Sequence, residues 1–331
     1  MHRIREGNTS FQRLVKQSLE LEPIRARKRR RRRNFVAARE EATDLFYSLD
    51  GTLECPCRSE HALYLCLDSF EPSGKNDRCH FVLATASVCL AAFETMATAK
   101  TDMQRTAVKH LCRALFSHAI DAPPKDIGFI GNTSSTRRNV VVSDVCLGSV
   151  DHFECGRILC SGRERRCLAL IMAASVLRLY ETPWVGERWV RQSIGFARKL
   201  GGSASASPLV ERVRTGAPQR DDSALQAGNL RLLSIRSEPL FAFGIFLIEL
   251  CFKKPFADLQ LPEDVIPGGL LECLTEFRTA TRLIPAVYSE AGQRYGDAVR
   301  RCIRCDFDFK TYDLDNEDFC QAVFEKVVAP L

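Results

Sequence analysis

The chain has 331 residues, of which 45% are hydrophobic, enough for one large domain or two ordinary ones with a sizeable core. The net charge of +6 belongs to residues 1–50, which hold 13 basic and 7 acidic residues, because the other 34 of each sign cancel. No run reaches the ~20 apolar residues of a transmembrane helix and no signal peptide is visible, so we expect a cytoplasmic or nuclear protein. The 15 cysteines then favour buried thiols over a disulfide framework.

The N-terminal part combines two helical patterns with a basic run between them. Apolar residues at helical spacing predict helices over 9–21 and 36–49. A run of this kind is typical of a nuclear import signal or a nucleic-acid patch, and equally of a solvated connector. We favour the connector, because no aromatic residue is interleaved with the basic ones. The run consists of Arg25, Arg27, Lys28, Arg29, Arg30, Arg31, Arg32 and Arg33.

Cys55, Cys57 and His61 are candidate metal ligands, in a Cys-x-Cys-x3-His pattern. A structural zinc site needs four ligands that converge tetrahedrally. Cys79 and His80 lie further along, but the combined spacing matches no common zinc finger. The pattern alone therefore assigns no metal site.

The first half has mixed patterns. The Ala-rich residues 84–97 are ambiguous and favour a helix. Strands are predicted over 63–67, 79–83, 127–130 and 140–146, and an amphipathic helix over 104–119. This half therefore reads as a small mixed α+β layer.

The second half is predicted to be mainly helical. Residues 237–255 are the most continuously apolar helix-length stretch and read as a central core helix. Residues 200–228 are rich in Gly, Ser, Ala and Asp, which predicts a long mobile loop. Further helices are predicted over 164–180, 270–277 and 295–305, with a final helix opened by Asp315. The fold class is α+β, a small mixed lobe followed by a mainly helical one.

The central helix carries a motif order found in protein kinases. Phe241, Gly244 and Glu249, followed by Pro-Phe, resemble the buried helix of the kinase large lobe, which reads Trp-Ser-x-Gly, then Glu-Leu, then Pro-Phe or Pro-Tyr. Residues 168–180 resemble the helix that precedes a kinase catalytic loop. The segment from Cys302 to Asp306 resembles the late Cys-Leu-x-x-Asp segment.

More specifically, residues 45–331 resemble a fungal kinase-like domain family of unknown function, of the DUF7580 type. The resemblance rests on the Cys-x-Cys-x3-His segment, on Thr182, Pro183 and Trp184, on the central helix, and on a closing Tyr-x-x-Ala-Val-x-x-Cys. Its members often follow helical domains of the HeLo or prion-inhibition type. The resemblance implies three parts: a helical and basic segment at 1–50, a remnant of such a domain; a small α+β lobe at 51–160; and a helical kinase-like lobe at 161–331.

The departures from the kinase pattern concern the catalytic parts. Phosphoryl transfer needs a phosphate-covering Gly loop, a Lys for the phosphates, a catalytic Asp, and Asp and Asn metal ligands. The chain has no Gly-x-Gly-x-x-Gly and no Asp-Phe-Gly, and Thr182-Pro-Trp stands where the catalytic loop should begin. Pro239 replaces the Asp that supports that loop. We therefore predict no catalytic residue, no cofactor-binding residue and no cofactor.

The leading hypothesis is a non-catalytic, pseudokinase-like module that acts through protein partners, in fungal signalling or regulated cell death as the resemblance implies. One alternative is a divergent phosphotransferase or nucleotide-binding protein. A second is a nuclear protein that binds nucleic acid through residues 25–33. A Cys–His nucleophile pair also stays open, since its partners need only meet in space.

Overall fold

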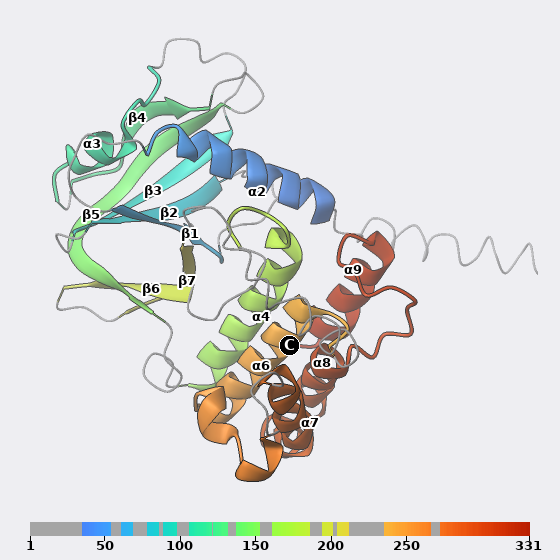
Figure 1. Ribbon diagram of the computed structural model, residues 1–331. Coiled ribbons are helices and arrows are strands. Elements are labelled where there is room, and N and C mark those ends of the chain that lie inside the picture. The colour runs from blue at the N-terminus through green and yellow to red at the C-terminus, as the bar shows by residue number, and fades with distance from the viewer. Residues whose placement is uncertain are drawn as a thin grey trace, which may run out of the picture. The chain divides into compact units, whose positions relative to one another are not determined.

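A computed structural model describes residues 35–53, 61–68, 78–85, 89–97, 106–120, 122–131, 137–152, 161–185, 194–200, 204–211, 235–265 and 272–331. Within these ranges the strands form one antiparallel sheet, and helices pack beside it (Figure 1). The fold is mixed α/β, which confirms the expected combination of strands and helices. The basic run and the candidate ligands Cys55 and Cys57 lie outside the described residues.

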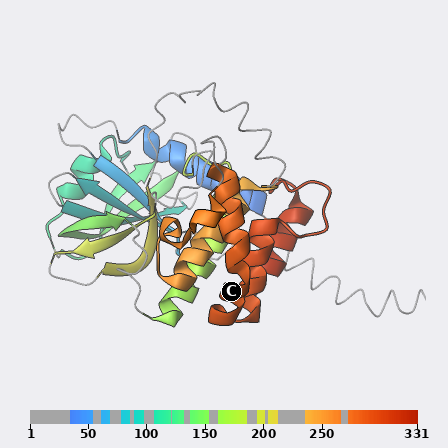
Figure 2. The same ribbon diagram turned by 60° about the horizontal axis from the view of Figure 1, so that its bottom comes forward.

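The strand pairings run in a closed circuit. The order is β3-β2-β1-β7-β6-β5, an additional pairing joins β3 to β5, and β4 adds to β5 outside the circuit. The long β5 makes closure possible, since it pairs with β3 as far as Leu147 and with β6 from Gly148 onward. Figure 2 shows the strands curving around one another. The strands are β1 (His61–Cys66), β2 (Arg78–Thr85), β3 (Cys89–Ala97), β4 (Lys125–Ile130), β5 (Arg138–His152), β6 (Ile194–Lys199) and β7 (Ala204–Glu211).

Alternation along the strands produces two apolar faces. Leu63 and Leu65 of β1 belong to the main core that the sheet shares with the helices, whereas Tyr64 and Cys66 belong to a second, smaller cluster. This is the period of two that an extended chain imposes on its side chains. The second cluster is enclosed by the circuit of strands and also contains Val82, Leu90 and Leu209.

The helices pack on one another and on the face of the sheet that carries Leu63 and Leu65. The α6 helix lies among α4, α7 and α8, and its residues from Phe243 to Cys251 are all buried. Pro239 occupies the first turn, where its missing N–H costs no hydrogen bond, and Lys253 ends the helix in a left-handed conformation. The helices are α2 (Phe35–Asp50), α3 (Leu111–Phe116), α4 (Gly162–Leu179), α6 (Glu238–Phe252), α7 (Glu272–Ala291), α8 (Gln293–Arg304) and α9 (Glu317–Val323), with 3₁₀ turns at Phe256–Leu259 and Pro262–Asp264 and a π-helical turn at Phe324–Val328.

Several predicted elements need correction. Residues 89–97 form a strand rather than a helix, because Leu90 and Phe93 face different apolar clusters across the sheet. The predicted loop 200–228 contains strand β7, so part of the sheet comes from the half that was expected to be mainly helical. The predicted helix 104–119 shrinks to α3, because Ala107 instead bridges to Phe129.

The predictions for 36–49, 164–180 and 237–255 are confirmed by α2, α4 and α6, while α7 extends well beyond the predicted 270–277. The last helix begins slightly later than predicted, with Asn316 rather than Asp315 as its N-cap. Among the described residues, no helix combines the length and apolar character needed to cross a bilayer.

Candidate functional site

The segment after α4, residues 181–185, connects parts of the fold through Thr182 and Trp184. Thr182 Oγ1 donates to the carbonyl oxygen of Leu179 at 2.7 Å and so satisfies the end of α4. Trp184 is fully buried, and its indole N–H donates to the carbonyl oxygen of Ala42 in α2 at 2.8 Å. Pro183 is half-buried between them. The predicted Thr-Pro-Trp motif therefore joins α4 to α2.

Trp184 is also the centre of an aromatic cluster. Its ring lies edge-on to Phe46 of α2, with centroids 5.3 Å apart, and 5.9 Å from Phe81 of β2. Phe81 in turn stacks on Phe93 of β3 at 5.1 Å. Aromatic pairs of this kind add ~0.5–1.5 kcal/mol each beyond the area they bury. The cluster therefore fixes α2 against the sheet.

The motif residues of α6 have structural roles that explain their spacing. The buried carboxylate of Glu249 accepts the backbone N–H of Phe256 at 2.7 Å, across the turn that follows the helix. Gly244 faces α8, where an added Cβ would lie 2.7 Å from Ile303 Cδ1 and 3.0 Å from Cys302 Cβ. The absence of a side chain therefore lets α6 and α8 approach closely. Phe241 is buried and stacks on Phe277 of α7 at 6.1 Å.

Cys302 and Asp306 lie at the end of α8. Cys302 is buried against Gly244, and burial raises the pKa of its thiol far above the ordinary value, so the thiol is inert. Asp306 is exposed and forms an ion pair with Arg300. The structure thus brings two of the predicted motif residues, Gly244 and Cys302, into contact.

His61 has a partner that the sequence did not single out. Its Nε2 lies 2.7 Å from the sulfur of Cys112 in α3. Burial raises the pKa of the Cys112 thiol, which disfavours the thiolate that a nucleophile or a metal ligand needs. Across the described ranges, no three His, Cys, Asp or Glu side chains gather as a metal site would require.

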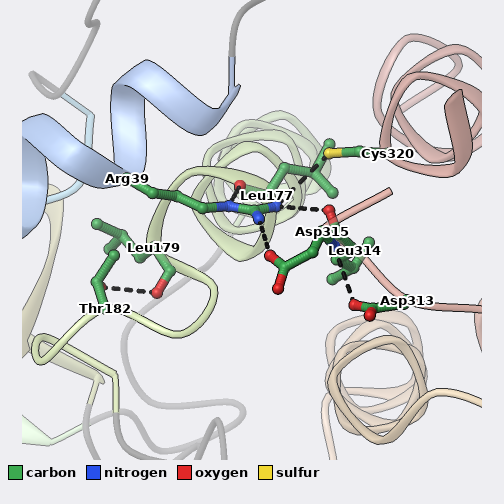
Figure 3. A network of polar contacts seen from close by, with 8 residues as sticks. All are labelled: Arg39, Leu177, Leu179, Thr182, Asp313, Leu314, Asp315 and Cys320. Atoms are coloured by element: carbon green, nitrogen blue, oxygen red, sulfur yellow. Dashed lines mark hydrogen bonds and ion pairs between the residues drawn. The ribbon is translucent and has the colours of Figure 1, made fainter. Parts of the chain in front are cut away.

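Arg39 of α2 is the main polar link between α2 and the rest of the chain. Its Nε donates to the carbonyl oxygen of Leu177 in α4 at 3.0 Å, and its Nη2 to that of Leu314 at 3.0 Å. Its Nη1 forms an ion pair with Asp315 at 2.7 Å. Figure 3 shows the guanidinium reaching from α2 between the end of α4 and the segment before α9, where Nη2 also lies 3.7 Å from Cys320 Sγ.

A groove of about 490 Å³ lies over this link, and we call it the acidic groove. Its lining includes the carboxylates of Glu40, Asp44, Glu181 and Asp315, against the single guanidinium of Arg39. Glu40, Asp44 and Glu181 are exposed and take part in no ion pair within the described part of the chain. The remaining lining residues are Val36, Thr43, Tyr180 and Thr182.

Besides burial, the negative charge around the groove raises the pKa of the Tyr180 hydroxyl. Burial raises the pKa of this phenol, and the nearby carboxylates of Glu181, Asp313 and Asp315 raise it further. Arg39 lies 5.1 Å from the centre of the Tyr180 ring, a favourable cation–π position. The groove therefore combines a rigid polar floor with a surplus of negative charge, which suits a cationic segment of a partner.

A larger cavity of about 550 Å³ opens at one end of the strand circuit. Its charged groups are largely paired: Lys199 with Asp144 at 2.7 Å, and Asp68 with the hydroxyl of Ser207. The thiol of Cys66 inside it has its pKa raised to about 12 by burial and by Asp68. Because Lys199, Asp144 and Asp68 already have partners and the thiol is protonated, these groups point to no particular ligand.

Sequence reasoning found Trp184 but missed Arg39 and the acidic groove. Arg39 stands within a helix of ordinary amphipathic character, and its partners are more than a hundred residues away in the chain. One signal was visible: an arginine on a helix at a position where apolar residues 38, 42, 45 and 49 mark the buried face.

Comparison with known families now adds to the geometry. The model of the domain of unknown function DUF7580 matches residues 136–331. The match covers more than half of the chain, so the chain belongs to the DUF7580 family. No curated protein matches the chain. The circuit of strands needs β1, β2 and β3, which precede the matched residues, so the folded unit is larger than the matched segment.

Proposed function

We propose that the protein is a non-catalytic, pseudokinase-like interaction module that regulates partners in fungal signalling or regulated cell death. Its order of kinase-like motifs supports the pseudokinase part, and the resemblance that includes HeLo-associated proteins supports the fungal setting. DUF7580 is a family of unknown function, so membership of it implies no particular activity. Fold analogy alone does not imply chemistry, so the proposal rests on the site.

One observation carries the non-catalytic part. In the kinase-like order, residues 181–185 occupy the place of a catalytic loop. Here the hydroxyl of Thr182 is bonded to the end of α4 and Trp184 is buried against α2, so both side chains serve the fold. The aromatic cluster of Phe46, Phe81 and Trp184 fills the space between α2 and the sheet. A phosphoryl-transfer site instead needs charged groups placed around a nucleotide and its metal ions.

The interaction part rests on the acidic groove. Four carboxylates stand against one arginine, and that arginine is already engaged by Asp315 and two carbonyl oxygens. Opposite charge on a partner steers its approach and selects it over neutral or acidic competitors. The proposed partner therefore presents Lys or Arg side chains along an extended segment or a helix face.

A binding experiment with charge variants tests this part. The probe is a fluorescent nona-arginine peptide, titrated with the full chain at low and at physiological salt. The site variant combines Glu40→Gln, Asp44→Asn and Glu181→Gln, all at exposed positions that tolerate substitution. The matched control combines Asp258→Asn, Glu263→Gln and Asp308→Asn, which remove the same number of charges at exposed positions outside the groove.

We expect salt-sensitive binding that weakens about tenfold or more in the site variant and is unchanged in the control variant. Equal binding by the wild type and the site variant contradicts a partner site in the groove. The nucleic-acid alternative has its own test, which is steeply salt-dependent DNA binding that disappears when residues 25–33 are deleted. The phosphotransferase alternative requires magnesium-dependent transfer of phosphate from ATP by the purified protein.

A further inference from the structure

Three arginines converge on a pocket at the end of the helical part that lies away from the acidic groove. The pocket has a volume of about 360 Å³ and lies among the start of α4, the end of α6 and the junction of α7 with α8. Arg165 and Arg166 come from the first two turns of α4, and Arg294 from the first turn of α8. We call it the arginine pocket.

The guanidinium groups of Arg165 and Arg166 lie close together. A Cβ built on Gly162 would have Arg165 Nη2 at 3.8 Å and Arg166 Nη1 at 3.9 Å, so both groups border the same small space. Two positive charges at this separation repel each other, and a bound anion between them offsets the repulsion. The start of α4 lies in the same place, and its capping box of Ser161 and Glu164 already occupies two of the first backbone N–H groups, so the arginine side chains are the main donors left for a ligand.

These arginines form no ion pair with a carboxylate in the part of the chain that the structure describes. Arg165, Arg166 and Arg294 form no ion pair there, with Leu331 or with any side chain. Arg165 Nη1 is buried without a hydrogen-bond partner. A buried donor without a partner costs ~1–3 kcal/mol, and more when it is charged, so the arrangement favours a bound acceptor. Glu290 is the one side-chain carboxylate among the described lining residues, so the three guanidinium groups outnumber the side-chain carboxylates of the lining.

The remaining walls are apolar or already satisfied. Leu250 and Cys251 of α6 line one side. Tyr295 lines another side. Its hydroxyl donates to the carbonyl oxygen of Leu247 at 2.8 Å, so a ligand would contact the ring of Tyr295 rather than its oxygen. A ligand that fits these walls carries a compact organic group beside its charge. The volume lies within the ~300–1,000 Å³ of ordinary small-molecule sites.

We propose that the arginine pocket binds a small phosphomonoester, whose dianionic phosphate lies between Arg165, Arg166 and Arg294 and whose organic group packs on Tyr295. The planar forks of guanidinium groups match phosphate oxygens in pairs, which makes arginine the preferred residue for this anion. The surplus of guanidinium groups over side-chain carboxylates favours an anion of high charge, such as a phosphomonoester at neutral pH. The proposal is independent of the proposed function, because the acidic groove and the arginine pocket share no residue.

The phosphomonoester has two sources, a soluble metabolite or a lipid headgroup. Glucose 6-phosphate represents the first, with glucose as the uncharged control, and its binding to the full chain is measured by calorimetry. Vesicles of phosphatidylcholine with phosphatidic acid represent the second, with pure phosphatidylcholine vesicles as the control, and binding is measured by co-sedimentation.

The variants separate the pocket from general surface charge. Arg294→Glu reverses one charge at an exposed position, and Arg165→Gln removes the buried donor. The matched control is Arg163→Gln, which changes an exposed arginine in the same turn of α4 that does not line the pocket. Thermal unfolding of each variant shows that it is folded before binding is compared.

We expect binding to glucose 6-phosphate or to phosphatidic acid vesicles, about tenfold or more weaker in Arg294→Glu and Arg165→Gln and unchanged in Arg163→Gln. Binding to the soluble compound assigns a metabolite, and binding to the vesicles alone assigns a lipid headgroup. The absence of binding to both probes overturns the proposal. Binding that falls equally in Arg163→Gln, or in none of the variants, overturns it too, because the anion is then attracted by general surface charge.

Discussion

Removal of the Arg39 side-chain charge tests whether α2 is an integral part of the folded domain. In Arg39→Met the two carbonyl oxygens of Leu177 and Leu314 lose their donor. The Arg39 side chain is about 10% exposed, so these bonds lie in a low-dielectric environment where water cannot replace them fully. A hydrogen bond from a charged donor contributes ~1.5–3 kcal/mol.

The ion pair with Asp315 adds little to this sum, because the Asp315 side chain is 54% exposed and such pairs contribute under about 1 kcal/mol. Most of the loss therefore comes from the two hydrogen bonds to carbonyl oxygens, which together contribute about 3–5 kcal/mol because contributions within one network are not fully additive. We therefore expect Arg39→Met to lower the free energy of unfolding by about 3–5 kcal/mol. Asp315→Asn, which keeps the guanidinium, should lower it by less than about 1 kcal/mol.

Urea unfolding followed by tryptophan fluorescence measures both variants, since Trp184 is buried against α2. Arg39→Lys is the matched variant that keeps the charge and loses the planar fork, and we expect an intermediate loss. The reasoning is refuted if Arg39→Met unfolds within about 1 kcal/mol of the wild type with an unchanged dependence on urea. That result would mean that the Arg39 contacts contribute little to holding α2.

Three further predictions concern stability. The hydrogen bonds from Arg282 hold the pKa of the buried Asp264 at about 2, below its ordinary 3.8, which corresponds to about 2 kcal/mol. Because the pKa of Asp264 is depressed in the folded state, this stability is present above about pH 4 and is lost as the pH falls toward 2. The free energy of unfolding of Asp264→Asn should therefore decline less steeply with acid than that of the wild type. An equal decline in both proteins would contradict the assignment. Gly244→Val places atoms against Ile303 and should cost about 2 kcal/mol or more by urea unfolding, whereas a neutral effect would deny the close approach of α6 and α8. Trp184→Phe removes the indole N–H that donates to the carbonyl oxygen of Ala42 in α2, and it should lower the free energy of unfolding by ~1–3 kcal/mol. Amide hydrogen exchange in α2 should become faster. Unaltered exchange would mean that other contacts hold α2 in place.

Strong local patterns made much of the helical part predictable. The apolar stretch 237–255 identified α6, because a helix-length run that is hydrophobic on all sides is typical of a helix buried in the core. The motif residues Gly244 and Glu249 were found from a resemblance, and their contacts with α8 and with Phe256 supply the physical reason for the spacing.

The strand circuit was less accessible from the sequence. Residues 89–97 are rich in Ala and carry little intrinsic preference for a strand, so their pairing with β2 and β5 decides the outcome. Strand β7 lies within a segment of small polar residues and gains its conformation from β1 and β6. Both are cases in which tertiary pairing outweighs local propensity.

The two sites were beyond sequence reasoning for a different reason. The acidic groove combines residues of α2 with Glu181 and Asp315, and the arginine pocket combines α4 with α8. Each charge alone is an ordinary surface residue. Only the fold brings like charges together, and the lack of counter-charges becomes visible only when the neighbours are known.

Transfer of phosphate from ATP is the measurement that bears most directly on the proposed loss of catalysis. The purified full chain is incubated with magnesium and radiolabelled ATP, alone and with a general protein substrate, and Arg39→Met serves as a variant with a weakened fold. Since Thr182 and Trp184 are engaged in the structure, we expect no label above that of the buffer control. Magnesium-dependent labelling that co-purifies with the chain and falls in Arg39→Met would contradict the account, because it would show that a catalytic site exists although Thr182 and Trp184 are buried.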